Sequence, residues 1–478
     1  MAVLENLEPK NVFRFFEDLC AIPHGSGNTK AISDYLVNFA KERGLEYHQD
    51  ELNNVIIAAE AAPGYENAPA VIIQGHMDMV CEKAPGCSKD MSREGLDLAV
   101  EGDHVYAKGT TLGGDDGIAV AMALAVLDDR SIPRPRVEAV ITVDEETGME
   151  GARGLDLSPL KGNMVLNIDS EDEGIFTVSC AGGATVECHM PVVREAFEGG
   201  SLNIVVDGLI GGHSGAEIDK MRANSNMLMG RLLYALKKSE DFRLVSVDGG
   251  LKDNAIPTKS AAVITAKNAE GVKAVCAGME KIFRDEFRVT DGNIKVTVSP
   301  ADEAPAMDSA STAAVISMLC CLPNGIQAMS ADIKGLVQTS LNLGILTSAG
   351  TEVCASFSVR SSVDSQKRML MDRLSCFMEQ LGGSVAVRGD YPGWAYRQNS
   401  PLRDLMAEVF TEQYGHAPRI EAIHAGLECG LFIGKRPELD CVSFGPDIKE
   451  IHTFREKLCI ASTQRTWKLL LEVLRRIK

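Results

Sequence analysis

Short apolar strands alternate with helices along the first third of the sequence, and this order limits the folds that the chain can adopt. Four apolar runs of strand-like character, rich in Val, Ile and Leu, lie at residues 54–60, 70–77, 136–146 and 163–171. The segment GIAVAMALAVLDD (117–129) is apolar on nearly every side, which is typical of a buried helix. Strands that alternate with helices predict an α/β domain with a mostly parallel sheet covered by helices.

The pattern changes in the middle of the chain. Residues 184–388 contain shorter strands with one apolar and one polar face, which predicts an α+β arrangement. A helix followed by a hairpin occurs twice there, with hairpins at residues 252–268 and 338–362, and this indicates an internal duplication. The first pattern then returns. We therefore expect a discontinuous α/β domain, residues 1–183 plus 389–478, that carries an inserted, duplicated domain, residues 184–388.

Composition narrows the possible partners and the compartment. The chain has 478 residues, which is too long for a single ordinary hydrophobic core and favours two or three domains. Its formal net charge of −19 disfavours nucleic acid and anionic membranes as partners. It has no uninterrupted apolar run of about 18 residues, and its first residues lack a signal-peptide pattern. The 13 cysteines show no C-x-x-C spacing, which favours reduced thiols. We expect a cytoplasmic protein without a nucleic-acid or membrane partner.

Acidic residues and histidines gather at the ends of the predicted strands. The motifs are GHMD (75–78), GTTLGGDDG (109–117), ITVDEETG (141–148), LNIDSE (166–171) and SFGPDIKEIHTF (443–454). Each motif alone has an ordinary interpretation, such as a loop histidine, a helix N-cap or a solvated acidic turn. In an open α/β sheet, however, the carboxyl ends of the strands meet at one edge, where so many carboxylates repel one another unless a cation neutralises them. The motifs together predict a metal site.

The types of side chain in these motifs indicate which metals would bind. Two histidines and three carboxylates without paired cysteines suit zinc, cobalt or manganese. Five protein ligands are too many for one catalytic tetrahedral ion, but they suit two ions that share a bridging carboxylate. A carboxylate left over from that set would then be available as a general base for water.

The same motifs resemble those of a known enzyme family. GHMDMV, GDDG, DEETG, NIDSE and a late IHTF, in this order and with an intervening GGHSG, are similar to the co-catalytic di-zinc exopeptidases, which include carnosinases, tripeptidase and aminoacylase. The strings AIPHGSGN, TTLGGDDGIAVAMALA, HAGLECGLF and YPGW resemble the branch of aminoacyl-histidine (Xaa-His) dipeptidases. The resemblance spans the whole chain and implies a metal-binding catalytic domain with an inserted lid or dimerisation domain.

The resemblance also implies roles for individual residues. Two divalent ions, zinc with cobalt or manganese as alternatives, would be held by His76, Asp115, Glu146, Asp169 and His452. His76 and Asp169 would bind one ion, Glu146 and His452 the other, and Asp115 both. Asp78 would orient the ring of His76, a role that suits two residues on the same side of a strand. Glu145 would be the general base.

Three further residues are implied in substrate binding. His213, in GGHSG, would donate a hydrogen bond to the developing oxyanion. Arg360, in FSVRSS, would pair with the carboxylate of the substrate, because its planar guanidinium suits that partner. Glu428, in HAGLECG, would hold the free amino group, or alternatively cap a helix. His24 and His424 lie in branch-typical strings without an assigned role.

These observations favour a dipeptidase that acts on dipeptides with a free N-terminus, Xaa-His and β-alanyl-histidine included. Glu145 would activate the water, and the enzyme would act alone or as a homodimer. Two alternatives stay open: an aminoacylase or broader aminopeptidase of the same superfamily, and a non-catalytic metal-binding protein.

Overall fold

The computed structural model describes residues 2–478, and the chain divides into two compact units. Unit 1 comprises Met1–Ser179, Tyr396–Ala422 and Leu427–Lys478, and unit 2 comprises Cys180–Ala395 and Ile423–Gly426. The chain enters unit 2 at Cys180 and returns to unit 1 at Tyr396, whereas the boundaries predicted from the sequence lie at residues 183/184 and 388/389. Within the described residues, no helix combines the length and the apolarity needed to cross a bilayer.

The core of unit 1 is an eight-stranded sheet in the order β1-β2-β6-β3-β7-β23-β8-β22. Its strands are β1 (Glu46–Gln49), β2 (Val55–Ala59), β3 (Val71–His76), β6 (Val137–Thr142), β7 (Met164–Asn167), β8 (Ile175–Cys180), β22 (Arg419–Ile423) and β23 (Asp440–Ser443). The four central strands β6, β3, β7 and β23 run parallel. The neighbouring pairs β1–β2, β2–β6 and β23–β8 are antiparallel. The predicted α/β class is confirmed, with antiparallel strands added at the flanks.

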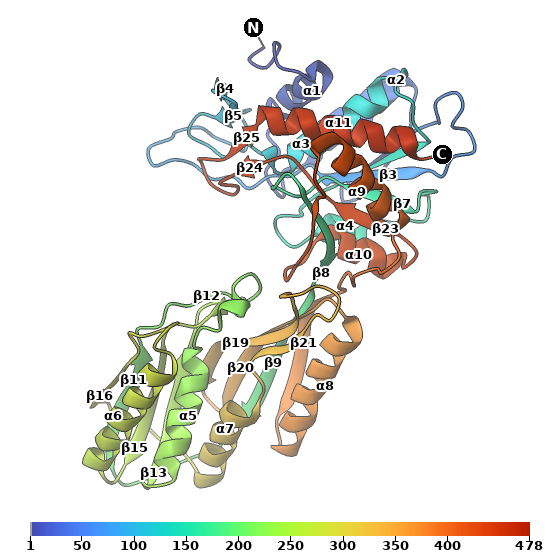
Figure 1. Cartoon of the computed structure of the whole chain (residues 1–478). Helices are drawn as coiled ribbons and strands as arrows, with labels where there is room; N and C mark the ends of the chain where they lie inside the picture. The colour runs from blue at the N-terminus through green and yellow to red at the C-terminus, as the bar shows by residue number, and fades with distance from the viewer. Residues whose placement is uncertain (1) are drawn as a thin grey trace. The chain divides into compact units, whose positions relative to one another are not determined.

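Helices and a small second sheet complete unit 1. The helices are α1 (Lys10–Cys20), α2 (Lys30–Arg43), α3 (Gly114–Asp128), α4 (Glu150–Gly154), α9 (Pro401–Tyr414), α10 (Glu428–Lys435) and α11 (Ile460–Arg476). The small sheet contains β4 (Leu98–Glu101), β5 (His104–Ala107), β24 (Ile448–Lys449) and β25 (Lys457–Cys459). Helix α3 is buried from Gly114 to Leu127 and packs against α1 and β3, as its apolar sequence predicts. Helices α9 and α11 lie side by side (Figure 1).

Unit 2 is built from two copies of one arrangement. Its strands are β9 (Gly182–Pro191), β10 (Arg194–Glu195), β11 (Gly200–Asp207), β12 (Gly212–His213), β13 (Phe242–Gly249), β14 (Ala255–Ile256), β15 (Ser260–Ala266), β16 (Lys295–Pro300), β17 (Ala306–Met307), β18 (Gly325–Met329), β19 (Val337–Ala349), β20 (Glu352–Ser361) and β21 (Ser384–Tyr391). Its helices are η1 (Ile218–Lys220), α5 (Ser225–Lys237), α6 (Ala269–Glu286), α7 (Ser309–Cys321) and α8 (Asp364–Gln380). The main sheet has the order β16-β11-β15-β13-β19-β20-β9-β21.

The two halves of this sheet are equivalent, because β16-β11-β15-β13, counted from one edge, corresponds to β21-β9-β20-β19, counted from the other. The elements β11-α5-β13-β15-α6-β16 correspond one by one to β9-α7-β19-β20-α8-β21, and the two copies meet where β13 pairs with β19. The helices α5, α6, α7 and α8 cover one face of the sheet (Figure 1). The internal duplication predicted from the sequence is therefore present in the fold.

Candidate metal centre

Five side chains that were predicted to bind metal lie at one edge of the unit 1 sheet. His76 is the last residue of β3, Asp169 follows β7, and Glu146 follows β6. Because these three strands are parallel, their carboxyl ends lie at the same edge. The remaining two, Asp115 and His452, come from the first turn of α3 and from the loop between β24 and β25.

The carboxylate of Asp115 lies between two histidines. Its Oδ1 is 3.2 Å from Nε2 of His76, and its Oδ2 is 3.2 Å from Nε2 of His452. His76 Nε2 also lies 3.6 Å from Asp169 Oδ1, and His452 Nε2 lies 3.0 Å from Glu146 Oε2. These contacts divide the cluster into a pair His76–Asp169 and a pair His452–Glu146, with Asp115 facing both.

The chemistry of the cluster fits divalent cations. Asp115, Asp169 and Glu146 keep no more than a tenth of their side-chain surface exposed, and Oε1 of Glu146 is buried without a hydrogen-bond partner. Within residues 2–478, the ion pairs that these three carboxylates form are with His76 and His452 and not with lysine or arginine. Two groups of three residues bring ligand atoms within 4.8 Å of one another. Buried carboxylates with so little cationic compensation are a suitable environment for metal ions.

Asp116 is an additional member of this cluster that the sequence left outside the predicted ligand set. It forms one of the two groups, with His76 and Asp169. Its Oδ2 accepts a hydrogen bond from the backbone N–H of His76 at 3.2 Å. A Cβ atom at Gly75 would lie 2.4 Å from this oxygen, so a glycine at that position allows the start of α3 to approach β3. Burial and the nearby Asp169 raise the pKa of Asp116 well above its usual value.

Asp78 contacts both His76 and the loop that carries Glu145. Nδ1 of His76 lies 3.0 Å from the backbone carbonyl oxygen of Asp78 and 3.5 Å from its Oδ1. The same Oδ1 accepts the backbone N–H of Glu145 at 3.1 Å. The Glu145 side chain is partly buried, and burial together with Asp169, Glu428 and Glu146 raises its pKa to about 9.

Glu428, the first residue of α10, points toward the sheet. It is fully buried, and its Oε2 accepts hydrogen bonds from Gln74 Nε2 at 2.5 Å and from Thr142 Oγ1 at 2.7 Å. Its Oε1 is buried without a partner. Burial, and to a lesser extent Asp169, raises the pKa of Glu428 to about 7. These bonds do not reach the amides of α10, so the geometry does not favour the helix-capping alternative.

Unit 2 brings His213 and Arg360 together with His424, which lacked an assigned role in the sequence. Nδ1 of His213 accepts the backbone N–H groups of Gly215 and Ala216 at 3.2 and 3.0 Å, so the proton of the neutral ring is on Nε2. Nε2 of His424 is 2.7 Å from Ser340 Oγ, while its Nδ1 is buried without a partner.

Arg360 supplies a buried positive charge beside these two rings. It lies on β20 directly opposite Ser340 of β19 and is 9 % exposed, and its Nε has no hydrogen-bond partner. Burial, Arg360 and His213 lower the pKa of His424 to about 3. Burial and Arg360 also lower the pKa of His213. Within the described chain, Arg360 forms no ion pair with a carboxylate, so this cluster suits an anionic ligand.

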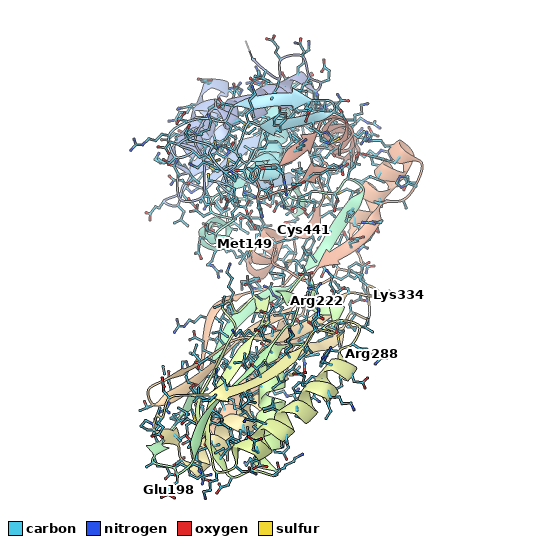
Figure 2. All side chains as sticks on the ribbon, turned by 90° about the vertical axis from the view of Figure 1, so that its left-hand side faces the viewer. Met149, Glu198, Arg222, Arg288, Lys334 and Cys441 are labelled. Atoms are coloured by element: carbon cyan, nitrogen blue, oxygen red, sulfur yellow. The ribbon has the colours of Figure 1, made fainter. Side chains whose placement is uncertain are left out.

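The His213 loop also has a defined place in unit 2. The strand β12 lies at the end of the unit that bears Arg222 and Lys334, whereas Glu198 lies at the opposite end (Figures 1 and 2). The backbone N–H of His213 donates to Glu217 Oε2 at 3.0 Å, and Glu217 forms an ion pair with Arg222. These contacts hold the His213 loop at that end.

Four residues of these sites were missed in the sequence: Gln74, Thr142, Ser340 and Glu456. Glu456 accepts backbone hydrogen bonds from the segment that contains Asp115. Their partners are tens to hundreds of positions away, so no local motif identifies them. His424 begins the string HAGLECG, and this string was the one sequence signal that pointed to a role for it.

Comparisons with known proteins agree with this architecture. Residues 205–291 match the family model that is described as a peptidase dimerisation domain. The chain is 36% identical to the cytosol non-specific dipeptidase of Escherichia coli, over 100% of this chain and 99% of that protein. It is 35% identical to the crystal structure of aminoacylhistidine dipeptidase from Vibrio alginolyticus, with a TM-score of 0.94 over 99% of this chain and 98% of that one.

A more distant likeness concerns the fold alone. The aminopeptidase PepT of Bacillus cereus superimposes with a TM-score of 0.57 at 16% identity, over 98% of this chain and 99% of that one. The α/β fold contains a buried cluster of histidines and carboxylates. Together with the similarity to the Escherichia coli and Vibrio alginolyticus dipeptidases, this cluster defines a metal-dependent peptidase. The chain belongs to the M20 peptidase family.

Proposed function

We propose that the chain is a dipeptidase that uses two metal ions and hydrolyses dipeptides with a free amino group and a free carboxylate. The observation that carries this proposal is the carboxylate of Asp115, whose two oxygens each face a different histidine. Such an arrangement suits a carboxylate shared between two cations. The names of the two relatives that match the whole chain support the reaction class.

His76 and Asp169 would hold one cation, Glu146 and His452 the other, and Asp115 both. Zinc is the proposed ion, with cobalt and manganese as alternatives, because the donors are imidazoles and carboxylates. When bound, the cations supply Lewis acidity toward the scissile carbonyl and the attacking water.

Glu145 is the proposed general base. Its carboxylate takes a proton from the attacking water and later delivers it to the leaving amine. In the second step the protonated carboxyl acts as an acid. Asp78 is the proposed positioning residue, because it contacts both the His76 ring and the Glu145 backbone.

Glu428 is the proposed partner of the free amino group. Its Oε1 is buried and free to accept, whereas its Oε2 is fixed by Gln74 and Thr142. An ammonium group bound there would compensate a buried negative charge that forms no ion pair with a lysine or arginine of the described chain. An acetylated substrate lacks this charge, so the free dipeptide is favoured over the substrate of an aminoacylase.

Unit 2 supplies the proposed groups for the other end of the substrate. The Arg360 guanidinium would pair with the carboxylate, and His424 Nδ1 is available for a second hydrogen bond to the same group. His213 Nε2–H is the proposed donor to the oxyanion. All three come from one chain: His213 and Arg360 lie within the duplicated arrangement, and His424 lies in the returning segment Ile423–Gly426.

The proposed substrates include Xaa-His dipeptides, since one relative is named for aminoacylhistidine and the other is called non-specific. We also propose a cytoplasmic location, supported by the word cytosol in the name of one relative. Unit 2 is proposed as the lid and dimerisation domain of a homodimer, supported by the match at residues 205–291.

An activity panel on the zinc-loaded protein tests the proposal. Ala-His, β-Ala-His and several dipeptides without histidine would be compared with their N-acetylated forms. We expect hydrolysis of free dipeptides that is lost on chelation and restored by zinc, cobalt or manganese. Preferential hydrolysis of N-acetyl amino acids would favour the aminoacylase alternative. Metal binding without hydrolysis of any of these compounds would favour a non-catalytic protein.

A further inference from the structure

The carboxylate of Glu456 binds the start of α3 through four backbone amides. Its Oε2 accepts the N–H groups of Leu112 and Gly113 at 2.7 and 2.9 Å. Its Oε1 accepts those of Gly114 and Asp115 at 2.8 and 3.2 Å. Both oxygens are therefore fully used, each by two donors.

This carboxylate is buried without a cationic side chain. Glu456 is 3% exposed and is not part of any ion pair within residues 2–478. The four N–H groups offset the cost of burying its charge. A Cβ atom at Gly114 would lie 3.1 Å from Oε1, so the glycine leaves room for this close approach.

Glu456 connects the two chain segments that carry Asp115 and His452. It lies four positions after His452 in the same loop, and its backbone N–H donates to Thr453 O at 3.1 Å, which closes a turn within that loop. Its partners at residues 112–115 lie 341 to 344 positions away in the sequence. The amide of Asp115 is one of the four donors. These four hydrogen bonds, here called the clamp, therefore act directly on the residue whose carboxylate faces His452.

The histidine of this loop has little other support. The His452 side chain is 47% exposed, and the contacts it makes among the described residues are with Asp115 and Glu146. His452 also has a left-handed backbone conformation, with φ of 59°. His76, in contrast, is buried at the end of a central strand, and its backbone N–H bonds to Asp116.

We infer that Glu456 is a positioning residue that fixes the separation of His452 and Asp115, and so shapes the cation position formed by His452, Glu146 and Asp115. The position formed by His76 and Asp169 shares Asp115, but its other two ligands are held by β3 and β7, so it depends less on this clamp. Loss of the clamp therefore weakens one cation position much more than the other. The inference rests on the proposed metal ligands.

Glu456→Gln is the decisive variant. An amide side chain has one acceptor oxygen, and its NH₂ group would face two N–H donors, so half of the clamp is lost with little change in volume. Glu138→Gln is the control, although Glu138 also pairs with Arg136 at 3.0 Å. Glu138 is also a buried glutamate of unit 1 that accepts two backbone N–H groups, from Lys161 and Gly162, but it lies near the start of β6, away from the cluster.

Titration of the metal-depleted full-length proteins with Co²⁺, followed by calorimetry and by visible absorption, measures each affinity and the stoichiometry. For Glu456→Gln we expect one site with wild-type affinity and one weakened by about 10- to 100-fold, the range found when a residue that supports a ligand is changed. Glu138→Gln should retain both affinities. Thermal unfolding and circular dichroism verify that the variants are folded.

Two unchanged affinities in folded Glu456→Gln, or an equal loss at both sites, would overturn the inference and leave Glu456 as a simple helix cap. If Glu456→Gln does not fold, Glu456→Asp keeps the charge and is expected to weaken the same single site by a smaller factor; unchanged or equal affinities there also overturn it. A wild-type protein that binds fewer than two Co²⁺ ions would instead contradict the proposed function.

Discussion

The carboxylate of Asp78 joins the ring of His76 to the backbone of Glu145. Its Oδ1 lies 3.5 Å from Nδ1 of His76 and accepts the N–H of Glu145 at 3.1 Å, while its Oδ2 accepts the hydroxyl of Ser26 at 2.8 Å. One buried side chain thus orients a proposed metal ligand and holds the loop of the proposed base. The two functions cannot be varied independently at this position.

His76 and Asp78 should therefore differ in what their loss does to metal binding. His76→Ala removes a ligand and is expected to lower the stoichiometry by one ion. Asp78→Ala should keep two ions with affinity lowered by about 10- to 100-fold, because it removes the support and not the ligand. Metal analysis after dialysis against a zinc buffer distinguishes the two results. If neither substitution changed metal binding, His76 would not be a metal ligand and Asp78 would not support one.

Removal of the Glu145 carboxylate should separate metal binding from turnover. Glu145→Gln is expected to bind both ions, since Glu145 is not a proposed ligand, and to lower kcat by about 10²- to 10⁴-fold, the usual contribution of a general base. Steady-state kinetics and metal analysis on the same sample check both parts. The exposed Glu150 offers a matched control, Glu150→Gln, which should behave as wild type. Wild-type kcat in Glu145→Gln would exclude the proposed base.

Arg360 should determine recognition of the substrate carboxylate. A charge-assisted hydrogen bond contributes about 1.5–3 kcal/mol, so Arg360→Ala is expected to raise KM for a dipeptide by about 10- to 100-fold. The variant should have little effect on the already weak hydrolysis of the matching dipeptide amide, which carries no carboxylate. The exposed Arg388 on β21 provides the control, Arg388→Ala. An equal effect of Arg360→Ala on acid and amide would argue against this role.

His424 should contribute to the same discrimination by a smaller amount. His424→Ala removes a neutral imidazole beside Arg360, and a neutral hydrogen bond contributes about 0.5–1.5 kcal/mol, or a few-fold in KM. The ratio of KM for the acid and the amide is the measurement. Ser340→Ala, which leaves the ring without its partner at Nε2, should produce a change in the same direction.

Glu428 should make the stability of the metal-free protein depend on pH. Its pKa in the folded protein is about 7, above the ordinary value of 4.5, so the folded state holds a proton that the unfolded state releases in this window. Its contribution to stability is therefore present below about pH 4.5 and is lost as pH rises to about 7. Glu428→Gln does not titrate, so its advantage over the wild type should grow across that range by up to about 3 kcal/mol.

Urea denaturation of both metal-free proteins, at intervals of about one pH unit between pH 5 and pH 8, measures this difference in the free energy of unfolding. A stability difference that stays constant with pH would mean that Glu428 is ionised in the folded protein throughout. Thr142→Val, which removes one hydrogen bond to Oε2, should raise the pKa further and shift the window upward.

Much of unit 1 could be predicted from local patterns. The apolar runs became β2, β3, β6 and β7, and the segment apolar on all sides became the buried helix α3. The antiparallel pairing of β2 with β6 was not predicted, because an apolar run that is buried on both faces has no pattern that reports its direction. Repeated helix-hairpin patterns likewise revealed the duplication but not the β13–β19 junction between the copies.

The sequence by itself determined which side chains stand at the ends of the central strands, because strand period and parallel pairing carry His76, Glu146 and Asp169 to one edge. Only the tertiary structure decided how Asp115 faces two histidines, how Glu456 clamps the start of α3, and how His424 lies beside Arg360. These contacts join segments tens to hundreds of residues apart. Their distances depend on how whole elements pack, and local sequence does not encode that packing.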